Sequence, residues 1–404
     1  MNLLGLITVT VCVPLITGLI LDSGSGSIKN TLTTETLVKR YGYPFEKHTV
    51  QTDDGYILEL HRIPCASESN EASNTPCPVA FLFHCLLCSS SEFVIMGPDD
   101  SLGFLLSKAG YDVWLGNARG NTYSRNHANL KVNGVLNDKF WDFSWHEIGM
   151  IDLPTMLKYV LNETGVEQVT YFGHSQGTTT FFVLNSMQPE YNKIFKSAHL
   201  LSPVAYFNGN NTFLQVGGPY VGRSSLIQTA FGKTEFRPSK EIMKLVGKVL
   251  CPNSSKNHIF CENALLLLAG FTNETVAKTA VADVMASTPA GASTNQVFHY
   301  IQEFVSGKFR QFDHGFIGNL KAYGSLSPPE YPLEVIDVPI FMYHSVADSL
   351  TSIKDVDKLV KRLKTLVGKY FIDIENFDHM AHLYAENLGE KVNKHVMKDV
   401  ASMK

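Results

Sequence analysis

Short β-rich segments alternate with longer amphipathic segments over most of this chain. The β-rich segments are mostly apolar throughout, as expected for strands that are buried on both faces of a parallel sheet. The predicted strands are 79–83, 112–115, 169–172, 198–201, 339–343 and 370–375. The predicted helices, with apolar residues three and four apart, are 148–161, 177–187, 353–366 and 381–397. This alternation predicts a doubly wound, mostly parallel α/β sheet.

The alternation is lost between about residues 206 and 330, where the sequence becomes helical and rich in glycine, with clustered Leu and Phe. A proline-rich stretch at 327–332 marks the end of this region. With 404 residues, 44% of them hydrophobic, the chain can bury one large core, which excludes a disordered or collagen-like protein. We therefore predict an α/β core in two parts, 30–205 and 331–404, with residues 206–330 as a helical insertion over the sheet.

The balance and distribution of charge argue against nucleic acid as a partner. Thirty-four Lys and Arg residues stand against 38 Asp and Glu, and no basic block is present that would neutralise phosphates. Nucleic acid is therefore not an expected partner.

The first 21 residues carry no charged side chain, consist mostly of Leu, Ile and Val, and run into the small polar segment 22–27. This pattern predicts a signal peptide at 1–21 and a secreted or lysosomal protein. A positively charged start is missing and the apolar run 3–21 is long enough to span a bilayer, so a signal anchor is the alternative. No permanent transmembrane anchor is expected under the first interpretation.

Entry into the secretory route would expose four Asn-x-Ser/Thr sequons to glycosylation. They begin at Asn162, Asn210, Asn253 and Asn273.

Six cysteines follow the leader, an even number that suits an oxidising compartment. Their spacing favours a disulfide between Cys251 and Cys261, and it also allows one between Cys65 and Cys77. Cys85 and Cys88 form a C-x-x-C without a second such pair or a spaced His pair, so neither a zinc site nor any other metal or cofactor is expected. Because a disulfide would close a very short loop here, two free thiols are preferred. A thiol redox protein is disfavoured, since no helix is expected to begin after the first cysteine.

A G-x-S-x-G motif, Gly173 to Gly177, lies between a predicted strand and a predicted helix. In this context the sharp turn lifts the Ser175 hydroxyl to a helix N-terminus, and glycines flank it because a Cβ would clash. The alternative is a glycine-rich turn with a bystander serine. The strand before the motif and the helix after it favour a nucleophile.

A serine hydroxyl needs a general base, and the base needs an acid to hold its tautomer. In such folds the chain order is Ser, then Asp or Glu, then His. Asp348 and His379 each follow a late predicted strand, and so lie at the edge of the sheet where sites form.

Other residues compete for these two roles. His382 lies a turn further into the next predicted helix, which makes it the weaker candidate for the base. Asp337 and Asp355 compete with Asp348 for the acid.

The tetrahedral intermediate of acyl transfer needs two backbone N–H donors. One comes from the residue after the nucleophile, Gln176, and the other from the loop after an early strand, where Leu86 is the candidate. An ordinary apolar strand end is the alternative interpretation of Leu86.

Long stretches of the sequence, between about residues 35 and 395, resemble the acid lipases, the family that includes gastric lipase, lysosomal acid lipase and many insect lipases. The matching segments are Tyr-Gly-Tyr-Pro at 41–44, the stretches 52–58 and 60–64, the run 110–125 with Gly-Asn-Ala-Arg-Gly-Asn, and 140–145, 152–154 and 173–179.

The resemblance implies an α/β-hydrolase core with a helical cap and lid. It implies Ser175, Asp348 and His379 as the catalytic triad and Leu86 and Gln176 as the oxyanion donors. It also matches Cys251 and Cys261 to a disulfide of the family's cap. The substrates would be neutral lipid esters, triacylglycerols or sterol esters, met at a lipid–water interface.

The sequence departs from the family at three places. Cys85 replaces the glycine of His-Gly-Leu-Leu, His344 and Ser345 replace a glycine-bearing turn before the acid, and Ala381 replaces an acidic residue after the base. A distorted oxyanion loop would make this a catalytically weak homologue that binds or carries lipid. We favour a Cys85 with negative φ, which leaves the loop intact.

Overall fold

The computed structural model describes residues 32–65, 76–132, 138–207, 232–236 and 276–403. The predicted signal peptide, the Cys251 and Cys261 pair, and the sequons at Asn210, Asn253 and Asn273 lie outside these residues. Asn162 is described and is exposed on a helix.

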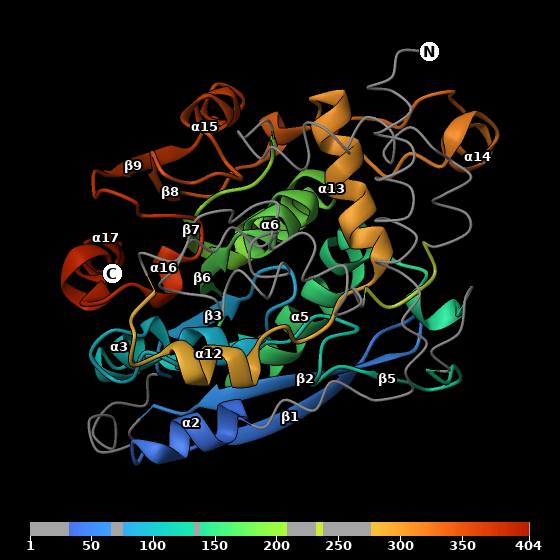
Figure 1. Ribbon diagram of the computed structural model, residues 1–404. Coiled ribbons are helices and arrows are strands. Elements are labelled where there is room, and N and C mark those ends of the chain that lie inside the picture. Colours follow the sequence, from blue (N-terminus) through green and yellow to red (C-terminus); the bar gives the residue numbers. More distant parts are fainter. Residues whose placement is uncertain (1–31, 66–75, 133–137, 208–231, 237–275, 404) are drawn as a thin grey trace, which may run out of the picture.

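One twisted sheet runs through the described part of the chain (Figure 1). Its order is β1-β2-β4-β3-β6-β7-β8-β9, with β5 paired to β2. The strands are β1 Glu46–Gln51, β2 Tyr56–Ile63, β3 Val79–Phe83, β4 Asp112–Gly116, β5 Asn126–His127, β6 Val169–His174, β7 Phe195–Leu201, β8 Ile340–Ser345 and β9 Leu366–Ile372. Every pairing from β4 through β3 to β9 is parallel, while β2 is antiparallel to β1, β4 and β5. The predicted doubly wound, mostly parallel sheet is confirmed.

The sheet separates two apolar layers. Successive residues of a strand point to opposite faces, so Ala80 and Leu82 of β3 join one layer while Phe81 and Phe83 join the other. Helices α3 and α17 pack in the first layer, and α5 and α6 pack in the second (Figure 1). Burial on both faces is the reason that the central strands are recognisable from composition alone.

The helices of the described residues are short. They are α2 Thr34–Arg40, α3 Leu102–Lys108, α4 Trp145–Glu147, α5 Leu153–Thr164, α6 Gln176–Met187, α12 Val281–Ser287, α13 Thr294–Ser306, α14 Gly315–Tyr323, α15 Ile353–Val360, α16 Ala381–Tyr384 and α17 Lys394–Ser402. Of these, α2, α4, α13 and α15 begin with a side-chain cap. α13 begins with a capping box between Ser293 and Gln296 and ends at Gly307, whose φ is 64°.

Several predicted boundaries were wrong. The last strand begins at Leu366 rather than 370. Its start was mispredicted because its side chains alternate between exposed and half-buried and lack the fully apolar pattern of the other strands. The long helix predicted over 381–397 is interrupted after Tyr384, where Ala385 becomes extended and pairs with Val276. The antiparallel strands β1 and β2 were missed, and β1 has the alternating pattern of an edge strand.

Helices α12, α13 and α14 lie between β7 and β8 in the sequence, within the predicted insertion. Figure 1 shows α13 alongside α6, where the Tyr300 and Thr179 hydroxyls are 3.0 Å apart. Among the helices that the structure describes, none has the length and apolar character needed to cross a bilayer.

Candidate active site

Ser175 stands at a sharp turn between β6 and α6. Its φ of 52° and ψ of −114° lie where non-glycine residues are rarely found. A Cβ on Gly177 would lie 2.1 Å from the Phe83 carbonyl oxygen, and one on Gly173 would lie 2.9 Å from the Gly177 carbonyl carbon. Both glycines are therefore required for the close approach of α6 to the ends of β6 and β3.

The three residues predicted as a triad form one buried chain of hydrogen bonds. Ser175 Oγ lies 2.7 Å from His379 Nε2, and His379 Nδ1 lies 2.8 Å from Asp348 Oδ2. Asp348 follows β8 and His379 follows β9, so both lie at the carboxyl ends of parallel strands. Three loops that are distant in sequence thus meet where the parallel strands β6, β8 and β9 have their carboxyl ends.

Asp348 is held ionised by its donors. Burial alone would raise the pKa of this carboxyl, but His379 and the donors of Thr351 outweigh burial and bring the pKa well below its usual range. The backbone N–H groups of Leu350 and Thr351 each donate at 2.9 Å, and the Thr351 hydroxyl donates at 2.7 Å. A carboxylate in this state orients the Nδ1–H of His379.

The competing residues lie elsewhere or lack partners. His382 is buried, neither of its ring nitrogens has a hydrogen-bond partner in the described structure, and burial lowers its pKa to about 3. Asp355 accepts the Ser352 N–H and hydroxyl in the capping box of α15. Asp337 precedes β8 and so lies at the opposite edge of the sheet.

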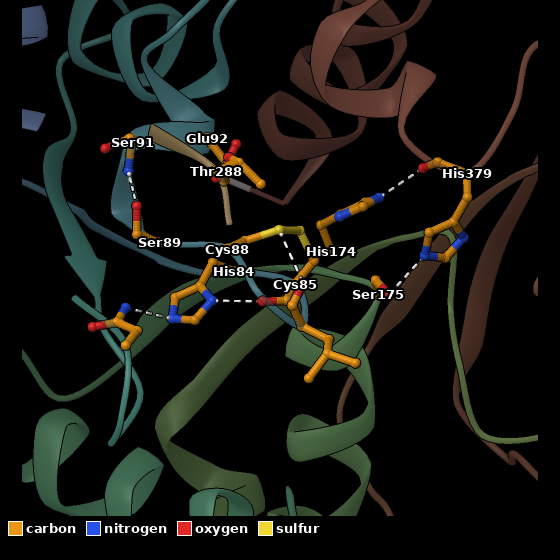
Figure 2. Close-up of a disulfide and its surroundings, with 12 residues drawn as sticks. His84, Cys85, Cys88, Ser89, Ser91, Glu92, His174, Ser175, Thr288 and His379 are labelled. Carbon is orange, nitrogen blue, oxygen red and sulfur yellow. Dashed lines mark hydrogen bonds between the residues drawn. A yellow bond between two sulfur atoms is a disulfide. The ribbon is translucent and has the colours of Figure 1, made fainter. Parts of the chain in front are cut away.

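The loop after β3 forms a tight turn beside Ser175 (Figure 2). The Cys88 N–H donates to the Cys85 carbonyl at 3.2 Å, which closes a β-turn with Leu86 and Leu87 at its centre. Cys85 has no positive φ, whereas Leu87 has a φ of 64°. The substituted position therefore does not need glycine, as we expected, and the left-handed residue is two positions further along.

The expectation of two free thiols in this turn was wrong, because Cys85 and Cys88 form a disulfide. A β-turn brings its first and fourth Cα atoms close together, here to 5.1 Å, which is within the range that a disulfide spans. The disulfide between Cys65 and Cys77 is also formed, as their spacing allowed. In the residues that the structure describes, no cluster of side chains could hold a metal ion.

Comparisons with known proteins agree with this architecture. A family model described as a partial alpha/beta-hydrolase lipase region matches residues 34–97, and one for the alpha/beta hydrolase fold matches 79–224. Lipase 3 of Drosophila melanogaster is 42% identical over 89% of this chain and 91% of its own length. The chain belongs to the acid lipase family.

Two human members of this family align over nearly the whole chain. Gastric triacylglycerol lipase is 33% identical over 94% of this chain and 92% of its own length. Lysosomal acid lipase/cholesteryl ester hydrolase is 36% identical over 95% and 94%. A Sulfolobus solfataricus protein described as a candidate lipase has the same fold, with a TM-score of 0.57, 14% identity, and coverage of 89% of this chain and 94% of its own. As a member of the acid lipases, the protein is a carboxylic ester hydrolase.

Several residues around the site of this acid lipase were not predicted from sequence. His174 donates from Nε2 to the His379 carbonyl at 2.9 Å, which ties the base loop to β6. Gln296 of α13 donates to the side-chain oxygen of Gln176 at 3.1 Å, and the Ala290 N–H donates to the Leu87 carbonyl at 2.6 Å. The capping box locates the start of α13, but no sequence pattern identifies its partners across the fold. Thr351 was within reach of prediction, since Asp side chains often bond backbone two or three residues on.

Proposed function

We propose that this protein hydrolyses neutral lipid esters through an acyl-enzyme on Ser175. The hydrogen-bonded chain Ser175–His379–Asp348 is the observation that carries the proposal, because its order and burial match what nucleophilic ester hydrolysis requires.

The reaction follows from the positions of the donors and acceptors. Ser175 Oγ attacks the ester carbonyl carbon while its proton passes to His379 Nε2, and Asp348 stabilises the imidazolium that forms. The N–H groups of Leu86 and Gln176 stabilise the oxyanion. His379 then protonates the departing alcohol, and a water molecule, deprotonated by the same histidine, releases the fatty acid from Ser175.

The names of the relatives support the substrate class, since one human relative is a triacylglycerol lipase and another a cholesteryl ester hydrolase. We therefore propose triacylglycerols or sterol esters at a lipid–water interface, with residues 206–330 acting as cap and lid. The gastric and lysosomal names likewise support a secreted or lysosomal location after removal of residues 1–21 as a signal peptide. Cys251 with Cys261, and glycans at Asn162, Asn210, Asn253 and Asn273, belong to the same proposal.

The test compares the wild type with Ser175→Ala on emulsified triacylglycerol and on cholesteryl ester. We expect fatty acid release by the wild type only. Lipid binding by both proteins without turnover by either would contradict the proposal and favour the alternative of a catalytically weak lipid carrier. A serine-reactive phosphonate, followed by peptide mapping, would show directly whether Ser175 is the nucleophile.

A further inference from the structure

His84 is a buried histidine at the end of β3 to which the mechanism gives no role. Its Nδ1 lies 2.7 Å from the Cys85 carbonyl oxygen. Its Nε2 lies 3.0 Å from the backbone nitrogen of Ala118 and 3.2 Å from Nδ2 of Asn121. Both ring nitrogens are thus engaged, one with the turn beside Ser175 and one with the loop after β4.

These contacts determine which nitrogen carries the proton. A backbone N–H can only donate, so Nε2 must offer its lone pair to Ala118. The Asn121 amide agrees with this assignment, because its Oδ1 accepts the N–H groups of Tyr123 and Ser124, each at 3.0 Å, and its NH₂ therefore faces His84. His84 is then protonated on Nδ1 and donates that proton to the Cys85 carbonyl.

The loop after β4, whose Ala118 and Asn121 contact the His84 ring, is itself fixed by several hydrogen bonds. The backbone N–H and Nε of Arg119 donate to the Asp152 carboxylate at 2.9 and 2.7 Å, and both side chains are almost completely buried. Asn117 accepts the Ser90 N–H at 3.0 Å, which connects this loop to the segment following the turn. Burial, partly offset by the bond to Cys85, lowers the pKa of His84 to about 4, which keeps the ring neutral at higher pH.

The direction of the Cys85 carbonyl has a consequence for the next residue. The C=O and N–H of one trans peptide point in opposite directions. The Cys85 carbonyl points toward His84 and the Cys88 N–H, so the Leu86 N–H points away from them. Figure 2 shows His84 on one side of Cys85 and Ser175 on the other.

We propose that His84 is a positioning residue that aims the Leu86 N–H at the oxyanion formed on the Ser175 adduct. This rests on the proposed function, in which Leu86 is an oxyanion donor. His84 touches no reacting atom and acts only through the peptide that it orients.

Two substitutions distinguish the contribution of the Nδ1 donor from that of the Nε2 acceptor. In His84→Asn the side-chain NH₂ takes the place of Nδ1–H and still donates to the Cys85 carbonyl, while the acceptor for Ala118 is lost. In His84→Gln the side-chain oxygen reaches the place of Nε2 and still accepts from Ala118, while the donor to Cys85 is lost. Each variant therefore keeps one contact and removes the other.

The experiment measures kcat and KM on a soluble short-chain ester, together with thermal unfolding. We expect His84→Gln to lower kcat by about 10²-fold, the typical effect of a misplaced oxyanion donor, with KM changed less than about threefold. His84→Asn should keep kcat within about tenfold of the wild type although it is the less stable of the two proteins. Phosphonate titration normalises both rates to the number of competent sites.

Activity that follows stability, with His84→Asn the poorer enzyme, would overturn the proposal in favour of a purely structural histidine. Wild-type kcat in His84→Gln would overturn it as well. An ester hydrolysis that survives in Ser175→Ala would instead overturn the proposed function, and this inference with it.

Discussion

His84, next to the turn beside Ser175, and His379, next to Ser175 itself, are both buried and both carry a proton on Nδ1, yet their surroundings suit them to opposite roles. His379 has the Asp348 carboxylate behind it and the Ser175 hydroxyl in front, so a positive charge on its ring is stabilised. His84 has a neutral carbonyl on one side and two N–H donors on the other, so a second proton would meet no acceptor. The neighbouring groups thus determine whether a buried imidazole can act as a general base or only as a positioning residue.

The largest effect should come from removing the base itself. His379→Ala should lower kcat by roughly 10⁶-fold and abolish phosphonate labelling, because Ser175 then has no proton acceptor. His382→Ala is the matched control, since it removes a neighbouring buried imidazole that has no hydrogen-bond partner in the described structure. It should keep labelling. Loss of labelling in His382→Ala, with labelling kept in His379→Ala, would exchange the two assignments.

The next effect comes from making the surroundings of His379 neutral, as those of His84 are. In Asp348→Asn the carboxylate is lost and the amide favours the wrong tautomer of His379, so kcat should fall by about 10⁴-fold. Steady-state kinetics over a range of pH, with circular dichroism to verify folding, would measure it. A loss below tenfold would mean that Asp348 does not orient the base.

Glu92 extends the comparison to a buried carboxyl on the segment after the turn. It is almost fully buried, accepts from the Thr288 hydroxyl at 2.9 Å, and burial raises its pKa to about 8 despite bonds from Thr288 and Ser89. The folded protein therefore holds a proton that the unfolded chain releases above pH 4.5, and the free energy of unfolding falls as pH rises from 4.5 to 8.

Glu92→Gln removes this titration while keeping the shape of the side chain. The variant should match the wild type near pH 4.5 and exceed it by about 3 kcal/mol at pH 7, measured by chemical denaturation at both pH values. Glu390→Gln, on an 86% exposed side chain, is the control and should show no such trend. A gain independent of pH would mean that Glu92 is ionised in the folded state.

The smallest effects on catalysis should come from the disulfides. Cys85→Gly restores the residue typical of the family and keeps the Cys85 carbonyl in place for His84, so kcat should stay within a few-fold while stability falls by about 2 kcal/mol. Cys65→Ser removes the disulfide with Cys77 and should lower the free energy of unfolding by about 3 kcal/mol, because this disulfide closes a longer loop than that of Cys85 and Cys88. We expect kcat to be unchanged. A hundredfold rise of kcat in Cys85→Gly would show that the native turn is distorted and revive the lipid-carrier hypothesis.

Prediction from sequence succeeded where local pattern and chain order were sufficient. The strand before Ser175, the helix after it and the two flanking glycines follow from a motif that spans nine residues, 169–177. The placement of Asp348 and His379 in the loops that follow the last two strands follows from chain order. The strands β1 and β2 were missed for different reasons. β1, at the edge of the sheet, alternates between exposed and half-buried residues, as a loop can, whereas β2, beside it, has charged residues such as Glu59 and Arg62 among its buried ones.

The sequence by itself determined the doubly wound sheet, the position of the serine turn and the candidates for acid and base, because burial periodicity and turn chemistry are local. Only the tertiary structure shows that His379, and not His382, lies within hydrogen-bond distance of Ser175, since the two histidines are three residues apart and differ in what they face. It also decided the pairing of Cys85 with Cys88 and the tautomer of His84. These depend on where a carbonyl points and on which N–H groups lie opposite, and such directions arise when segments distant in the chain pack together.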